Sequence, residues 1–313
     1  RWLECPCVTR VAEAALATGK VLVAEVTASG GKRGEAVRVL GGSAFVEDVR
    51  VDQVELTVVV VDAAGRLVQE LPREAFTVYE DGRAVAVDGF GTTADLPLSL
   101  GILVDTSGSM ERTFADVRRA VTGFARELLR PGAAYFLPTF SFDASVEVPW
   151  TEDTRRLDGA LDGIEPEGGT ALHDSLVRSL EQFRGRRGRT ALVVLSDGDD
   201  TSSRTGWDVA LRFCRTVRTP VFPIGLRLPL LDLASRAHLK ELAESTGGQS
   251  FFVPKAEELA AAYRQISAQL RAQYLLSYRS PSTRGRDEFR AVRVEVAREG
   301  ATARTIAGYY PGW

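Results

Sequence analysis

Residues 98–109 read LSLGILVDTSGS, a largely apolar run that ends in small and polar residues. Because LSLGILV is apolar at nearly every position, it predicts a strand that is buried on both faces, as in a parallel sheet. A second such run, TALVVLS at 190–196, leads into the acidic stretch Asp197 to Asp200. Helical patterns lie between these strands, the first carried by Phe114, Val117, Val121, Phe124 and Leu128. The alternation predicts a Rossmann-like, doubly wound α/β domain with a mainly parallel sheet over residues 96–271.

The segments on either side of this domain are rich in strand patterns. Residues 1–95 contain apolar or alternating stretches of strand length, and Asp81-Gly82 predicts a hairpin turn. Residues 272–313 return to strands that are too few to fold alone. We therefore expect residues 272–313 to complete the β-rich, Ig-like or sandwich-like element of 1–95, with the α/β domain inserted in it or flanked by it. The aromatic tail is expected to pack as part of a last strand rather than to form an exposed binding patch; it comprises Tyr309, Tyr310 and Trp313.

Composition narrows the function classes. The 313 residues carry a net charge of only −3, which argues against a protein that binds nucleic acid through general basicity. No apolar run approaches the roughly 18 residues that a membrane helix needs. Cys214 shares a helical stripe with Ala210 and is expected to be a buried small hydrophobe. Cys5 and Cys7 lie too close to bridge each other comfortably, and either a disulfide elsewhere or half of a metal site remains open for them.

Polar side chains from three separate segments are expected at one edge of the sheet. Asp105 follows the first buried strand, Asp197 follows the second, and Thr170 precedes a helix. Doubly wound sheets bind ligands at the carboxyl ends of their strands, and the alternating positions of Asp105, Ser107 and Ser109 let their side chains converge. Carboxylate and hydroxyl oxygens suit a hard divalent cation such as Mg²⁺. These donors would leave part of the positive charge of the cation unneutralised. A vacant coordination position would therefore attract another anionic oxygen, for example a carboxylate of a partner protein.

The order DTSGS, GGT and SDG resembles the DxSxS…T…D signature of the metal-ion-dependent adhesion site (MIDAS) in von Willebrand factor A (VWA) domains. The resemblance extends over about 98–271 and includes Thr246-Gly247-Gly248 before a strand. The outer segments resemble those of bacterial VWFA-related secreted proteins of the acidobacterial type, with a lead-in VELTVVVVDAAGRLV…FTVYEDG and a tail YLLSY…FRAVRVEV…GYY. All five signature positions match: Asp105, Ser107, Ser109, Thr170 and Asp197.

The resemblance implies a function as well as a fold. Asp105, Ser107, Ser109 and Thr170 would bind Mg²⁺ (or Mn²⁺ or Ca²⁺) directly or through water, and Asp197 would act mainly through water. The family's usual role is protein recognition without turnover, so a non-enzymatic binding or adhesion module is expected, with a partner Asp or Glu completing the metal coordination. Together with the start of the chain at Arg1, where an export signal would have been removed, the resemblance implies a secreted, periplasmic or cell-surface location.

Two other functions compete with this interpretation. The chain would be a constitutive scaffold subunit of a larger extracytoplasmic complex if its contacts spread over the β element and tail. It would be a metal hydrolase if His173, one helical turn past Thr170, acted as a general base beside Asp105. The sequence has only two histidines and contains no GxxxxGK[ST], HExxH or GxSxG motif, which disfavours the hydrolase.

Single residues of the predicted site have structural alternatives. Ser107 or Ser109 would serve as a helix N-cap if the metal site were absent. Asp199 and Asp200 are expected to be solvated loop acids rather than an extension of the anionic rim. His173 is expected to pack locally in the first turn of its helix.

Overall fold

A computed structural model describes residues 53–311 apart from 94–95, 130–131, 158, 187, 198–199 and 286, together with the backbone of residues 20–27 and 33–40. The described strands are β1 (Lys20–Thr27), β2 (Arg33–Leu40), β3 (Gln53–Val61), β4 (Phe76–Glu80), β5 (Arg83–Val85), β6 (Val87–Thr92), β7 (Leu98–Asp105), β8 (Ala134–Phe140), β9 (Ala144–Thr151), β10 (Arg189–Ser196), β11 (Val221–Leu226), β12 (Phe251–Val253), β13 (Tyr274–Arg279), β14 (Arg290–Val296), β15 (Thr302–Arg304) and β16 (Gly308–Tyr309). The described α-helices are α1 (Phe114–Leu128), α2 (Leu172–Glu181), α3 (Trp207–Val217), α4 (Leu233–Thr246) and α5 (Leu259–Arg271). None of these helices combines the length and the apolar character needed to cross a membrane.

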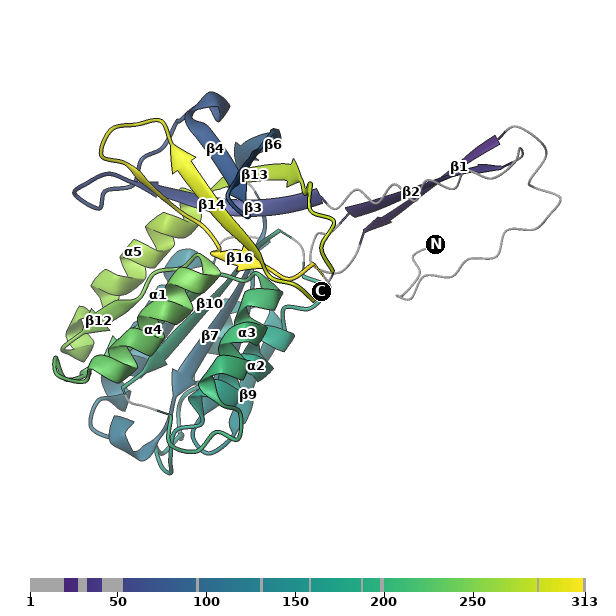
Figure 1. Ribbon diagram of the computed structural model, residues 1–313. Helices are drawn as coiled ribbons and strands as arrows, with labels where there is room; N and C mark the ends of the chain where they lie inside the picture. The colour runs from purple at the N-terminus through teal and green to yellow at the C-terminus, as the bar shows by residue number, and fades with distance from the viewer. Residues whose placement is uncertain are drawn as a thin grey trace.

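The α/β part is built on a six-stranded sheet with the order β12-β11-β10-β7-β8-β9. Its neighbouring strands run parallel except for the edge strand β9, which is antiparallel to β8. All eight residues of β7 are buried, as expected for a strand with helices on both faces. The predicted doubly wound α/β fold with an antiparallel β element beside it is therefore confirmed (Figure 1).

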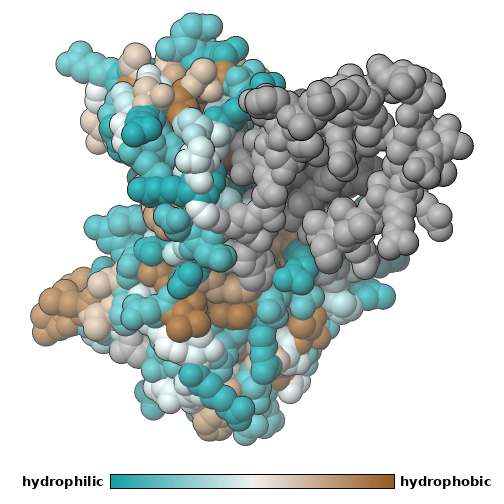
Figure 2. Space-filling view, turned by 45° about the vertical axis from the view of Figure 1, so that its right-hand side comes forward, coloured by the Kyte–Doolittle hydropathy of each residue, from teal (hydrophilic) through white to brown (hydrophobic). Residues whose placement is uncertain are grey.

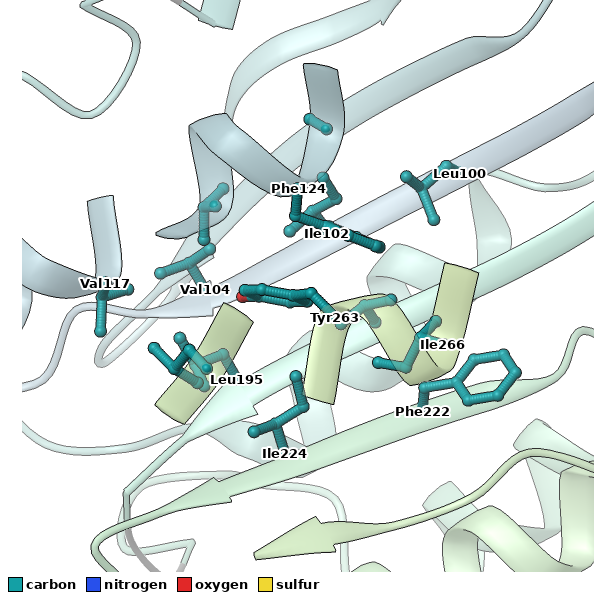
Figure 3. Close-up of a cluster of buried hydrophobic side chains, with 14 of the residues drawn as sticks. Leu100, Ile102, Val104, Val117, Phe124, Leu195, Phe222, Ile224, Tyr263 and Ile266 are labelled. Carbon is teal, nitrogen blue, oxygen red and sulfur yellow. The ribbon is translucent and has the colours of Figure 1, made fainter. Parts of the chain in front are cut away.

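Successive side chains of the central strands point to opposite faces of the sheet, so the core has two layers. Leu100, Ile102 and Val104 of β7 join one apolar cluster with α1 and α5, and Figure 3 shows these side chains around Phe124 and Tyr263. The rings of Phe124 and Tyr263 stack with their centroids 4.3 Å apart. Side chains on the other face, from β7, β8 and β10, pack with α2, α3 and α4. Helices thus cover both faces of the sheet. The loops that connect strands and helices lie at the ends of the strands.

The β part consists of two four-stranded sheets, β15-β3-β13-β6 and β16-β14-β4-β5. β13 follows the α/β part in the sequence and yet lies between β3 and β6, which precede it. β14 likewise pairs with β4. The inner faces of both sheets share one apolar cluster. The hairpin turn predicted at Asp81-Gly82 joins β4 to β5, and both residues have positive φ there. β1 and β2 form a separate antiparallel pair, and Cys5 and Cys7 lie outside the described residues.

The turn Thr246-Gly247-Gly248 after α4 needs both of its glycines. Gly247 caps the helix in the left-handed conformation, with φ 79°. A Cβ at Gly248 would come within 1.9 Å of the backbone oxygen of Val221 on β11. The chain can therefore pass close to β11 only because position 248 has no side chain.

The C-terminal tail packs against α3. The guanidinium of Arg218 lies 4.2 Å from the ring centroid of Tyr309, and that of Arg212 lies 5.2 Å from the ring centroid of Tyr310. Tyr309 is buried, so this part of the tail packs as expected, whereas Trp313 lies outside the described residues. These cation–π contacts help to hold the two parts of the chain together.

The thiol of Cys214 should stay unmodified in the folded protein. It is fully buried on α3, as its helical stripe predicts, and burial raises its pKa to about 12. Since the thiolate is the reactive form, iodoacetamide at pH 8 should leave Cys214 unlabelled until urea unfolds the chain. Peptide mass spectrometry would report each cysteine separately, with Cys5 and Cys7 followed in the same digest. Rapid native labelling of Cys214 would show that α3 opens from the sheet.

Candidate metal centre

Asp105 stands at the carboxyl end of β7 and is fully buried. One carboxylate oxygen, Oδ1, accepts a hydrogen bond from the backbone N–H of Ser107 (2.8 Å), and Oδ2 accepts one from the hydroxyl of Ser196 (2.6 Å). Burial raises the pKa of Asp105 to about 6, against the lowering effect of these hydrogen bonds. Among the described residues, no Lys or Arg forms an ion pair with it. The fold therefore holds a carboxylate where its ionised form is disfavoured, which is an arrangement that a bound cation would relieve.

Three of the other predicted site residues join Asp105 at this sheet edge. The hydroxyls of Ser107 and Ser109 lie 3.1 Å apart, and the Ser109 hydroxyl donates to Oδ1 of Asp197 (2.7 Å). Asp197 follows β10, and burial raises its pKa as well. The hydrogen bond from Ser109 and the charge of Arg227 offset only part of this increase. The sheet order places β7 directly beside β10, so the two carboxylates come to one place from distant parts of the sequence.

The alternative role of the serines as helix caps is not found. Ser107 precedes a short 3₁₀ helix, Gly108–Met110, without a capping hydrogen bond from its side chain. The residue before α1 is Thr113, and its side chain does not cap that helix either. Ser107 and Ser109 instead direct their hydroxyls toward each other, and Ser109 also toward Asp197. Their oxygens are thus placed beside the two carboxylates.

The loop that carries Thr170 lies against the segment after β7. The N–H of Gly108 donates to the carbonyl of Gly168 (3.2 Å), and the N–H of Glu167 donates to the carbonyl of Thr106 (2.9 Å). Thr170 itself is buried, and its N–H donates to the hydroxyl of Thr201 (2.9 Å). Within the described part of the chain, the side-chain hydroxyl of Thr170 makes no hydrogen bond to the other four predicted residues. The loop of Thr170 therefore lies at the site, whereas its side-chain hydroxyl does not bond to the other predicted residues.

The oxygen donors at this edge fit a divalent cation. Two carboxylates and two serine hydroxyls, with the Thr170 hydroxyl on the adjoining loop and without a thiol or imidazole, are the hard ligands that Mg²⁺, Mn²⁺ or Ca²⁺ prefers. Among the described residues no group of three or more His, Cys, Asp or Glu side chains gathers as a metal site, which distinguishes this hydroxyl-rich set from an all-carboxylate or zinc-type centre.

Asp200 is not the solvated loop acid that the sequence suggested. Only 11% of its side chain is exposed, and its carboxylate accepts hydrogen bonds from the N–H groups of His173 (2.9 Å) and Ser203 (3.0 Å). It therefore ties the start of α2 to the loop after β10, a role that depends on two loops meeting and has no local signal. Asp199 lies outside the described residues.

His173 packs locally, in agreement with the simpler expectation. Its Nδ1 lies 3.1 Å from the carbonyl of Thr205, and its ring lies 5.4 Å from that of Trp207. Trp207 in turn stacks on His238, with their ring centroids 4.6 Å apart. Nothing in these contacts directs the imidazole toward Asp105, so the geometry offers no support for a hydrolase that uses this pair.

Two further residues of the site lie outside the five signature positions. Ser196, the last residue of β10, holds Oδ2 of Asp105, and Thr201 holds the backbone of Thr170. Ser196 directly precedes Asp197 in the sequence, and this was the only signal that could have identified it. Thr201 has no comparable signal, because its partner lies 31 residues away.

Comparison with known proteins agrees with the fold of the α/β part. Residues 100–199 match the sequence profile described as von Willebrand factor type A domain. Among solved structures, the von Willebrand factor type A protein from Catenulispora acidiphila is 15% identical with a TM-score of 0.50, and the match covers 83% of this chain and 74% of that one.

Two further solved structures match part of this chain. Proximal thread matrix protein 1 from the mussel byssus, described with a zinc-occupied MIDAS motif, is 16% identical with a TM-score of 0.51, and the match covers 62% of this chain and 50% of that one. An aerotolerance-related membrane protein from Bacteroides fragilis is 19% identical with a TM-score of 0.46, and the match covers 55% of this chain and 98% of that one.

Proposed function

We propose that this chain, which contains a von Willebrand factor type A domain, is a non-enzymatic module that binds a partner protein through a divalent metal. Asp105, Ser107, Ser109 and Thr170 would hold Mg²⁺, or Mn²⁺ or Ca²⁺ in its place, and Asp197 would act mainly through water. When bound, the metal would supply a coordination position for an Asp or Glu of the partner.

The observation that carries this proposal is the buried carboxylate of Asp105 beside hydroxyl and carboxylate oxygens at the carboxyl ends of β7 and β10, where Ser109 is exposed. A purely structural acid at this position would be expected to have a cationic partner, because an unpaired buried charge is costly. Among the described residues Asp105 has none, and burial raises its pKa to about 6. The zinc-occupied MIDAS motif of the mussel protein gives a precedent for a metal in this fold.

The proposal extends to location and to a relationship within the family. The expected extracytoplasmic location and the resemblance to acidobacterial-type secreted proteins would place the partner outside the cytoplasm. The competing role, a constitutive scaffold subunit of an extracytoplasmic complex, does not require the metal for binding. Metal dependence therefore separates the two functions.

Partner capture should depend on Mg²⁺. The full chain is immobilised, and an extracytoplasmic fraction of the native cell is passed over it in Mg²⁺ or in EDTA. We expect proteins that are retained in Mg²⁺ and released by EDTA, and that do not bind an Asp105→Asn variant. An Asp162→Asn variant is the control, because this exposed carboxylate lies on a loop near α1 and pairs with Arg118. Partners that stay bound in EDTA, and that the Asp105→Asn variant also captures, would favour the scaffold.

A further inference from the structure

Exposed apolar side chains follow the two strands that lie next to β7 and β10, the strands that carry the candidate metal centre. Leu230 and Leu231, in the loop between β11 and α4, are 80% and 90% exposed, and Phe142, in the turn between β8 and β9, is 64% exposed. β8 is the neighbour of β7, and β11 is the neighbour of β10. Since these parallel strands all end at the edge that holds Asp105 and Asp197, the apolar residues follow the strands next to the site. Figure 2 shows apolar side chains standing out among polar ones on the α/β part.

Phe142 forms a wall beside the Thr170 loop. Its ring lies so close to the backbone of this loop that a Cβ at Gly168 would be 2.5 Å from the ring, and one at Gly169 would be 3.0 Å from it. The N–H of Ala171 donates to the carbonyl of Ser141 (2.7 Å), which fixes the turn that carries Phe142. The ring thus borders the metal centre directly before Thr170 and remains largely open to solvent.

The two leucines are held outward by an ordered turn. Leu228 points inward, and its side chain lies against Gly225 of β11. Asp232 caps α4 by accepting from the N–H of Ser235 (3.2 Å), and its own N–H donates to the carbonyl of Pro229 (3.1 Å). With both ends of the turn anchored, Leu230 and Leu231 lie on its outer side.

We propose that Phe142 on one side and Leu230 with Leu231 on the other bind apolar side chains that flank the partner's metal-binding Asp or Glu. This inference rests on the proposed function and adds the chemistry of the partner. The occupant is an extended protein segment with the pattern apolar–x–Asp/Glu–x–apolar. Its carboxylate complements the metal and the positive charge of Arg227, an exposed residue directly after β11 at the same end of the sheet. Its two apolar side chains complement surfaces that have no cover in the described part of the chain.

The spacing of the strands supports this pattern. Neighbouring strands lie about 4.8 Å apart, so β8 and β11 are each about 7 Å from the midpoint between β7 and β10. In an extended segment, residues two positions apart point to the same side and lie about 7 Å from each other. An acid at the midpoint therefore places side chains at positions −2 and +2 over the ends of β8 and β11, the strands that lead to Phe142 and to Leu230 and Leu231.

A displayed peptide library tests the proposal. Seven-residue segments with a central Glu and random residues elsewhere are selected on the immobilised full chain in Mg²⁺ and eluted with EDTA, and a library with a central Gln serves as the acid-free control. We expect apolar residues to be enriched at −2 and +2. The Phe142→Ala variant should lose the preference at one of these positions, and the Leu230→Ala/Leu231→Ala variant at the other. Each change should weaken binding of a selected segment about tenfold, as expected for one buried apolar side chain.

Controls separate a failure of the flanks from a failure of the metal centre. Val146→Ala changes an exposed apolar residue of the edge strand β9 and should leave the selection unchanged. The flank variants should keep the wild-type thermal response to Mg²⁺ alone, which shows that they fold and hold the metal. Segments that depend on Mg²⁺ and Asp105 without any preference at −2 and +2 would overturn this inference and leave the proposed function standing. Equal recovery of Glu and Gln libraries, with or without Mg²⁺, would overturn both.

Discussion

Replacing Asp105 with Asn should make the metal-free protein more stable and remove its response to Mg²⁺. Asp105 is fully buried, and its pKa is raised from 3.8 to about 6. Folding therefore disfavours the ionised form, by about 3 kcal/mol at pH 7 for a shift of about two pKa units. Asn has a similar shape and no charge, and its amide can still accept from the N–H of Ser107 and donate to the hydroxyl of Ser196.

The pH dependence has a definite sign. Because the folded pKa lies above 3.8, the cost of ionising Asp105 is absent below about pH 4, grows through about pH 6 and is complete above it. Asp105 should thus destabilise the metal-free wild type less at pH 5 than at pH 7. The Asp105→Asn variant should lose this difference in stability. Thermal unfolding in EDTA and in Mg²⁺, at both pH values, measures each effect.

The matched control is Asp162→Asn, whose exposed ion pair with Arg118 should contribute less than about 1 kcal/mol. An Asp105→Asn variant that is still stabilised by Mg²⁺ as strongly as the wild type would refute Asp105 as a ligand. A variant that is less stable than the wild type in EDTA would show that the carboxylate is needed for the fold itself.

Replacing Glu80 with Ala should produce the largest loss of stability in the β part. Glu80 on β4 is buried, and it accepts hydrogen bonds from the hydroxyls of Tyr278 (2.7 Å), Ser280 (2.6 Å) and Tyr309 (2.9 Å). The buried guanidinium of Arg290 donates to the hydroxyls of Ser280 (2.7 Å) and Tyr309 (3.4 Å). Burial is the main cause that raises the pKa of Tyr278, which stays a hydrogen-bond donor.

This network joins strands of both sheets, so its loss should be felt by the whole β part. Without Glu80, the hydroxyls of Tyr278, Ser280 and Tyr309 lose their acceptor. The loss of several buried hydrogen bonds to one charged group costs about 3–5 kcal/mol. Urea unfolding followed by circular dichroism measures the change. Glu74→Ala, an exposed residue in the turn before β4, should change the free energy of unfolding by less than about 0.5 kcal/mol.

A second variant tests whether the charge itself matters. Glu80→Gln keeps the volume and one acceptor oxygen but removes the negative charge that the hydroxyls of Ser280 and Tyr309 link to Arg290. We expect an intermediate loss of stability. A Glu80→Ala variant with the wild-type unfolding midpoint would show that water or a rearranged Arg290 replaces the carboxylate.

The order of elements and the candidate metal residues followed from local patterns. Apolar runs such as 98–104 predict doubly buried strands, and polar residues directly after them must lie at the strand ends. This was enough to predict that Asp105 and Asp197 meet, because parallel neighbouring strands end at the same edge. The loop before α2 contributed Thr170 to the same prediction, and this loop does lie against the segment after β7.

What the sequence by itself determined is therefore the fold class and the chemical types of the side chains at one sheet edge, since both depend on residues that are neighbours along a strand or helix. Only the tertiary structure decided how each group is held. Ser196 binds Asp105 across 91 residues of sequence, Asp200 anchors His173 across 27, and Phe142 packs on Gly168 from the turn between β8 and β9. Burial and hydrogen bonding of this kind arise when distant segments meet, and no local period or propensity encodes the meeting.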